Sequence, residues 1–158
     1  MKIKLYVLIS VALSASLAGA ATDPFNGTWN LNVQKSKYAR GACPKRMTIW
    51  METVGDGVHY RSETTYANGR SSSSQYTADY SGPAAMVRGA SGLMAPVSLK
   101  RLDSRRVVAS YVRALGVVAT SRRVVSENGR VMTITTTSRD HDGKAVTNVG
   151  VYDKSTVR

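Results

Sequence analysis

Apolar and polar residues alternate along the second half of the chain, in four successive segments that cover residues 105–113, 116–125, 130–139 and 144–153. The segments are joined at Leu115-Gly116, Asn128-Gly129 and Asp142-Gly143. Glycine adopts positive φ without steric cost, and Asn or Asp before it tolerates the left-handed region. Strands joined by such short turns are antiparallel neighbours, so this half of the chain is predicted to form a β-meander.

The first half of the chain continues the alternation. Trp29, Leu31 and Val33 alternate with polar residues, and Asn68-Gly69 is the strongest hairpin signal in the chain. Further strands are predicted over residues 25–33, 46–54, 58–67, 72–80 and 96–102. No amphipathic helix of more than one or two turns interrupts them. A sheet without covering helices hides one face by closing on itself. The pattern therefore predicts an all-β, antiparallel up-and-down β-barrel of about eight to nine strands. A two-sheet sandwich is less favoured, since it usually needs longer crossovers.

Residues 81–95 break this rhythm. The segment contains three glycines and one proline, and its apolar residues follow neither the helical nor the strand period. It is either a long flexible connection or a mobile flap over a cavity, because Met86, Val87, Leu93 and Met94 are more apolar than an idle loop requires. The meander has plain turns, so we expect the functional end of the barrel at this connection.

The first twenty residues have the pattern of a secretory signal peptide. Lys2 and Lys4 precede an apolar run from Leu5 to Ala15, and small residues end at Ala20. The run is shorter than the roughly 20 residues of a membrane-spanning helix. We expect cleavage near Ala20 and a periplasmic or secreted protein in which residues 21–158 form one domain.

The charge of the chain is strongly positive. The formal net charge is +12, and removal of Lys2 and Lys4 takes two of these charges, leaving +10. The arginines are dispersed over most predicted strands, which favours solubility and adhesion to anionic surfaces over specific binding of nucleic acid. A monomer is expected. Cys43, the one cysteine, has no internal partner and is either a partly buried thiol or a site of intermolecular pairing.

Catalytic signatures are sparse. The only cluster of potential metal ligands is Asp140, His141 and Asp142, in a predicted hairpin turn, and His59 alternates outward on its strand. A metal site needs more converging ligands than these. Phosphate-binding loops, nucleophile elbows and zinc-binding spacings are absent from the sequence. We therefore predict no catalytic residues, no metal, no cofactor and no enzymatic activity.

The predicted inner wall of the barrel is unusually polar. If Val58 and Val97 point inward, several hydroxyl-bearing residues and one arginine do so too. Buried hydroxyls and a guanidinium must find partners, so such a wall suits a solvated or ligand-filled cavity better than a solid core. The candidate ligand-binding residues are Tyr60, Ser62, Thr64, Tyr66, Tyr76, Met86, Met94 and Arg101, with Arg101 available to an anionic ligand group.

The segment Gly27-Thr28-Trp29 resembles the opening of lipocalins and fatty-acid-binding proteins, in which the tryptophan plugs one end of the barrel. Together with Lys35-Ser36-Lys37, the turn 55–58, the strand 97–101 and the ending 151–154, it resembles small exported bacterial barrels of lipocalin-like, calycin type. The resemblance implies a fold and little chemistry. It does not imply a fatty acid, because Gly150 and Val151 replace the Arg-x-Tyr arrangement before Tyr152.

The sequence therefore predicts an exported, non-enzymatic barrel that binds a small apolar or amphipathic ligand in its interior. Two alternatives remain: a structural barrel with a filled core, and a protein-binding barrel. Periplasmic lysozyme inhibitors of the second type carry a Ser-Gly-x-x-Tyr loop, which Ser81-Gly82 begins but which has Ala85 at the tyrosine position.

Overall fold

The structure is a computed structural model that describes residues 22–39, 43–89, 92–113 and 116–156, without the side chains of residues 92–94. The predicted leader and its cleavage position at Ala20 lie outside the described residues. The elements are β1 (Gly27–Leu31), η1 (Val33–Lys35), β2 (Arg46–Val54), β3 (Gly57–Thr65), β4 (Ser71–Asp79), β5 (Ala85–Gly89), β6 (Gly92–Asp103), β7 (Arg106–Arg113), β8 (Gly116–Val125), β9 (Val131–Arg139) and β10 (Ala145–Lys154). In the described part of the chain, no helix is long and apolar enough to cross a membrane.

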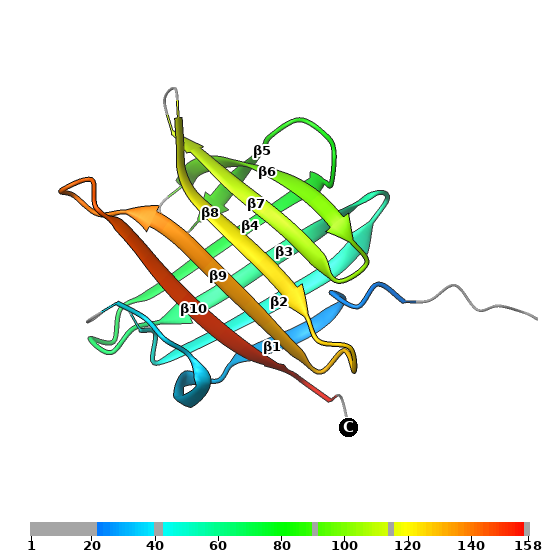
Figure 1. Cartoon of the computed structure of the whole chain (residues 1–158), viewed down its shortest axis with the longest axis horizontal. Helices are drawn as coiled ribbons and strands as arrows, with labels where there is room; N and C mark the ends of the chain where they lie inside the picture. Colours follow the sequence, from blue (N-terminus) through cyan, green and yellow to red (C-terminus); the bar gives the residue numbers. More distant parts are fainter. Residues whose placement is uncertain (1–21, 40–42, 90–91, 114–115, 157–158) are drawn as a thin grey trace, which may run out of the picture.

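The strands form one closed antiparallel barrel (Figure 1). Each strand pairs with its neighbours in sequence, and β1 closes the barrel by pairing with β10 through Trp29↔Lys154 and Leu31↔Tyr152. Each strand pairs on both sides, and closure encloses the apolar faces of the strands. This confirms the prediction of an all-β up-and-down barrel, with ten strands instead of about eight to nine.

The additional strand is β5, inside the segment predicted to be a loop or flap. Val87 is buried and Ala85 half-buried, whereas Met86 and Arg88 are exposed, so the segment does alternate with the period of a strand. Pairing with β4 is restricted to Ser74↔Gly89 and Gln75↔Arg88. The strand is short, and its pairing with β6 shifts register between Met86 and Arg88. The prediction of a loop or flap was wrong because small residues and nearby glycines obscured this short alternation.

The two ends of the barrel differ. We call the end with the β2–β3 and β8–β9 turns the closed end, and the end with the β3–β4 and β9–β10 turns the open end. At the closed end Trp29 is fully buried, and its indole Nε1 donates a hydrogen bond to the Phe25 carbonyl at 2.9 Å. The Lys154 ammonium lies 4.9 Å from the indole centroid. Phe25, Trp29, Val125 and Met132 belong to the buried core, so Trp29 has the surroundings expected of a barrel plug.

Candidate ligand-binding cavity

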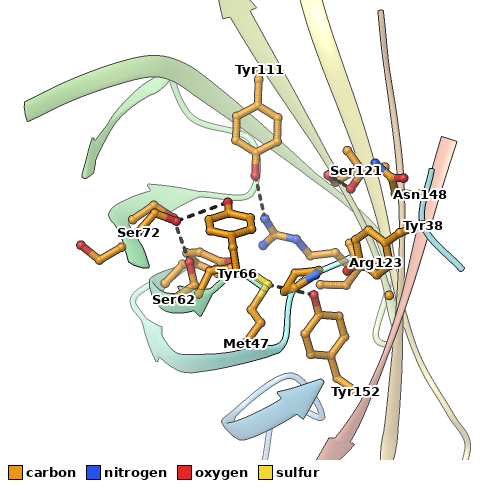
Figure 2. A pocket seen from close by; sticks show the side chains of 18 residues that line it. Tyr38, Met47, Ser62, Tyr66, Ser72, Tyr111, Ser121, Arg123, Asn148 and Tyr152 are labelled. Carbon is orange, nitrogen blue, oxygen red and sulfur yellow. Dashed lines mark hydrogen bonds between the residues drawn. The ribbon is translucent and has the colours of Figure 1, made fainter. Parts of the chain in front are cut away.

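The half of the barrel toward the open end contains a cavity of about 460 Å³. Its wall comes from β2, β3, β4 and β7 to β10 and from the segment between β1 and β2 (Figure 2). The lining residues are Tyr38, Pro44, Met47, Tyr60, Ser62, Thr64, Tyr66, Ser72, Ser73, Ser74, Tyr111, Ser121, Arg123, Ile134, Thr136, Asn148, Gly150 and Tyr152. The interior is therefore not packed solid, which argues against the alternative of a filled core.

Arg123 on β8 is the charged group of this cavity. The residue is only 3% exposed. Its Nη2 donates to the Tyr76 hydroxyl at 2.7 Å and, more weakly, to the Tyr111 hydroxyl at 3.3 Å (Figure 2 shows the second bond). The centre of the guanidinium lies 4.8 Å from the centroid of the Tyr60 ring, which stacks on Tyr76. Tyrosine rings and phenol oxygens therefore surround the cation on several sides.

These tyrosines do not neutralise Arg123. Within the part of the chain that the structure describes, Arg123 forms no ion pair with a carboxylate. Its Nε is buried and has no hydrogen-bond partner there. A buried charge normally has a counter-charge and a full set of hydrogen bonds, because loss of hydration is costly. The site therefore has unused capacity for an anionic oxygen.

Hydroxyl groups form a second polar zone around the cavity, in cross-strand pairs. Ser62 on β3 lies opposite Ser74 on β4, and their oxygens are 2.9 Å apart. Ser121 on β8 lies opposite Thr136 on β9, with oxygens 2.7 Å apart. Each hydroxyl can donate one hydrogen bond and still accept others, so both pairs retain acceptor capacity for water or a ligand.

A third zone, on the β10 side, is less polar. The Tyr152 hydroxyl donates to the Met47 sulfur at 3.2 Å. Gly150 leaves room for two tyrosines here, since a Cβ at this position would lie 2.7 Å from both the Tyr38 hydroxyl and the Tyr152 ring. Met47 and Ile134 supply apolar surface. One region of the cavity can therefore take an anionic group and another an apolar one.

Burial alters the proton affinity of the cavity tyrosines. It raises the pKa of Tyr60 to about 12, and it raises the pKa values of Tyr76 and Tyr152 as well. For Arg123, burial alone lowers the pKa, but Tyr76, Tyr111 and Tyr60 outweigh it, and the pKa is raised. At neutral pH the guanidinium is charged and the buried phenols are neutral.

These raised pKa values predict a loss of stability at alkaline pH. Unfolded tyrosines ionise near pH 10, whereas Tyr60 in the folded protein holds its proton to about pH 12. The free energy of unfolding should therefore be constant below about pH 9 and fall above pH 10, by up to about 1.4 kcal/mol per pH unit for each such tyrosine. Urea unfolding at a series of pH values measures this, and Tyr60→Phe should reduce the slope. Stability that stays constant to pH 12 would contradict the assignment.

The structure brings half of the candidate residues together and separates the others. Tyr60, Ser62, Thr64 and Tyr66 line the cavity, as expected from the alternation along β3. Tyr76 lies behind the lining and bonds Arg123. Met86 is 43% exposed and points to solvent, because it alternates opposite to Val87. The Met94 side chain lies outside the described part of the structure. Whether the lining residues bind a ligand stays a prediction.

Arg101 is on the expected side of the barrel wall but at the closed end, away from the cavity. It pairs with Asp23, and its guanidinium lies 4.1 Å from the centroid of the Tyr80 ring and 5.6 Å from that of Phe25. The contact ties the segment before β1 to the barrel. Strand alternation predicts which face a side chain occupies and leaves its height along the barrel axis undetermined. The arginine at the cavity is therefore Arg123 and not Arg101.

The sequence interpretation missed the contribution of the meander. Tyr111, Ser121, Arg123, Thr136, Asn148 and Tyr152 all belong to it and all line the cavity. A signal was present: Ser121, Arg123 and Val125 share one face of their strand, and two adjacent arginines cannot both face solvent. In the expected functional segment 81–95, no residue whose side chain the structure describes lines the cavity; a functional role of this segment stays a prediction. The turn 80–84 lies at the closed end, because β4 ends there beside Gly57.

Among the described residues, no three or more His, Cys, Asp or Glu side chains lie close enough together to hold a metal ion. His141 Nε2 lies 3.2 Å from an Asp142 carboxylate oxygen, on a fully exposed turn at the open end. Cys43 is half-buried, and its thiol lies 3.6 Å from the Pro44 carbonyl oxygen.

Comparison with known proteins supports the fold. No protein-family model and no curated protein sequence matches the chain. Among solved structures, the chain is similar to the zebrafish ileal bile acid-binding protein, which was crystallised with cholic acid. The match has a TM-score of 0.56 at 13% sequence identity and covers 84% of this chain and 99% of the other. At this identity the likeness concerns the fold alone, a closed antiparallel β-barrel.

Proposed function

We propose that the protein binds a small amphipathic anion inside the barrel, with the anionic group on Arg123 and the apolar part toward Met47 and Ile134. The observation that carries the proposal is the buried guanidinium without a carboxylate partner among the described residues, next to an internal cavity. Tyr111 on one side and the Ser121–Thr136 pair on the other offer further hydrogen bonds to the anion.

Free-energy considerations support this proposal. A buried cation without a counter-ion destabilises a fold, since its lost hydration is only partly replaced by phenol oxygens and ring faces. A bound carboxylate, sulfonate or phosphate would complete the coordination of Arg123 with short charge-assisted hydrogen bonds. Binding of the anion then removes the free-energy cost of burying Arg123 without a counter-ion, and this gain contributes to the affinity for the ligand.

The shape of the cavity also suits a small molecule. Its volume of about 460 Å³ falls within the range of roughly 300–1,000 Å³ that is typical of ligand pockets. The structural neighbour from zebrafish holds cholic acid, which is both apolar and anionic. A ligand of the same broad chemistry suits the combination of Arg123, hydroxyl pairs and an apolar wall in this chain.

The proposal extends to where and how the protein acts. The leader pattern of residues 1–20 supports export with cleavage near Ala20. We propose a binding protein without catalysis of its own, because the described lining of the cavity offers a fixed cation and phenols and contains no carboxylate or imidazole for acid–base catalysis. A monomer is proposed, since every strand of the closed barrel already has a neighbour on both sides.

The proposal can be tested with amphiphiles that differ only in their headgroup. Dodecanoate, dodecanol and dodecylamine are titrated into the mature protein by calorimetry. Hydrogen bonds to a charged partner predict that dodecanoate binds about 10-fold or more tighter than dodecanol, with the ammonium weakest. Equal affinities for the three compounds, or no binding of any, would contradict an anion site at Arg123. Native mass spectrometry of the freshly purified protein shows whether it retains an anionic ligand.

A further inference from the structure

Charge is distributed very unequally between the two ends of the barrel. Of the ten acidic residues in the chain, most lie at the closed end, in or beside its turns. These are Asp23, Glu52, Asp56, Asp79, Asp103, Glu127 and Asp153. Several of them neutralise basic neighbours, in the pairs Asp23–Arg101, Asp103–Arg106 and Glu127–Arg105. The closed end is therefore close to electrically balanced.

The open end is different. Its rim, which we define as the described strand ends and turns around the cavity opening, has many basic and few acidic side chains. The basic residues of this cationic rim are Lys45, Arg46, Arg70, Arg88, Arg113, Arg139 and Lys144, and all of them are exposed. Over the described part of the chain, no member of the rim forms an ion pair. The described acidic residues at this end are Asp140 and Asp142, in the β9–β10 turn, and Glu63, near the end of β3, which pairs with Arg61.

Exposed apolar side chains accompany these cations. Val117 and Val118, just after the β7–β8 turn, are 60% and 41% exposed, and Tyr66, at the β3–β4 turn, is 37% exposed. Tyr66 also lines the cavity, so the cationic rim borders its opening. Contact with water does not stabilise apolar side chains such as those of Val117 and Val118. Beside arginines and an amphipathic tyrosine, they match the boundary between headgroups and acyl chains of a lipid bilayer.

We infer that the open end of the barrel docks on an anionic lipid bilayer. The arginines and lysines of the cationic rim contact headgroup phosphates, and Val117, Val118 and Tyr66 enter the interface. Basic residues near an anionic bilayer each add to the attraction within a Debye length. Nucleic acid is a less suitable partner for the cationic rim. Proteins that bind nucleic acid usually have a continuous basic stripe with aromatic side chains that stack on bases, and exposed valines do not contribute to such binding. In this orientation the cavity opens onto the membrane, where amphipathic anions reside.

Vesicle sedimentation with the full mature protein tests the docking surface. Wild type should bind vesicles that contain phosphatidylglycerol, bind phosphatidylcholine vesicles much less, and dissociate at high salt. The rim variant Arg113→Glu/Arg139→Glu/Lys144→Glu should lose about 100-fold in binding. The matched control is Lys100→Glu/Arg122→Glu/Arg130→Glu, which changes net charge equally at exposed positions away from the rim. The control should lose far less.

A second variant separates a bilayer from a soluble polyanion. Val117→Ser/Val118→Ser keeps every charge and should weaken vesicle binding several-fold without changing binding to heparin. Three results would overturn the inference: no binding of wild type to anionic vesicles, equal losses in the two triple variants, or no effect of the valine substitutions. The proposed ligand site is measured separately, by dodecanoate titration without vesicles. Since Arg123 is not part of the rim, either proposal can fail while the other stands.

Discussion

Substitution of Arg123 by methionine, together with Tyr76→Phe, should weaken dodecanoate binding by about 100-fold or more, since loss of a desolvated charge partner typically costs 2–5 kcal/mol. The same variant should be as stable as wild type or more stable, by up to about 3 kcal/mol. Both effects have one cause: the buried guanidinium lacks a carboxylate among the described residues. Tyr76→Phe is included because the Tyr76 hydroxyl would otherwise lose the Arg123 Nη2 that donates to it. Calorimetry and urea unfolding measure the two effects.

The matched control for this experiment is Arg101→Met. Arg101 is also an inward-facing arginine that lies over aromatic rings, but it is paired with Asp23 and lies at the closed end. Its removal leaves the Asp23 carboxylate without its cation, so the protein should lose about 1–3 kcal/mol of stability and retain its affinity for dodecanoate. If the Arg123 variant is strongly destabilised and the Arg101 variant loses the ligand, the two roles are reversed and the proposed site is wrong.

Replacement of Trp29 by alanine should lower the free energy of unfolding by about 3–5 kcal/mol. The indole is fully buried, contacts the core at the closed end, and donates to the Phe25 carbonyl. Its loss leaves a cavity in the end of the barrel that neighbouring strands cannot fill without breaking their pairing. Urea unfolding monitored by circular dichroism measures the effect.

The second tryptophan of the chain is the control. Trp50 is on β2 with alternation opposite to Ile49, is half-buried on the outer wall, and has the Arg61 guanidinium 4.7 Å from its ring centroid. Trp50→Ala should cost much less, about 1 kcal/mol, because the ring lies outside the core and is only half-buried. Equal losses for the two tryptophans would show that the closed end does not depend on a plug.

Much of the architecture was accessible from the sequence because strand formation depends on local patterns. Alternation and Gly-containing turns predicted every strand except β5, and they placed Tyr60, Ser62 and Thr64 on one inner face of β3. β5 escaped because five residues with a single bulky inward side chain, Val87, give too little signal. Its pairing with β4 and β6 supplies what the local pattern lacks.

The candidate ligand site could be predicted from the sequence only in part. Alternation assigns a side chain to one of two faces, so the candidates on β3 were found and Arg101 was placed on the inner wall. It does not specify height along the barrel axis. It also does not show which side chains from β7, β8 and β10 meet those from β3. Tyr60, Tyr76, Tyr111 and Arg123 come together from four strands, and no spacing in the sequence links them.

By itself, then, the sequence determined every strand except β5, their antiparallel order and the polarity of the inner wall, because these depend on residues within a few positions of one another. The resemblance at the start of the chain already implied that Trp29 plugs one end of the barrel. Only the tertiary structure decided that Arg101 lies at that end, that Arg123 is the buried cation of the cavity, and that exposed basic residues surround the opening. The physical reason is that barrel closure and strand stagger set the position of each residue along the axis. These are properties of all ten strands together.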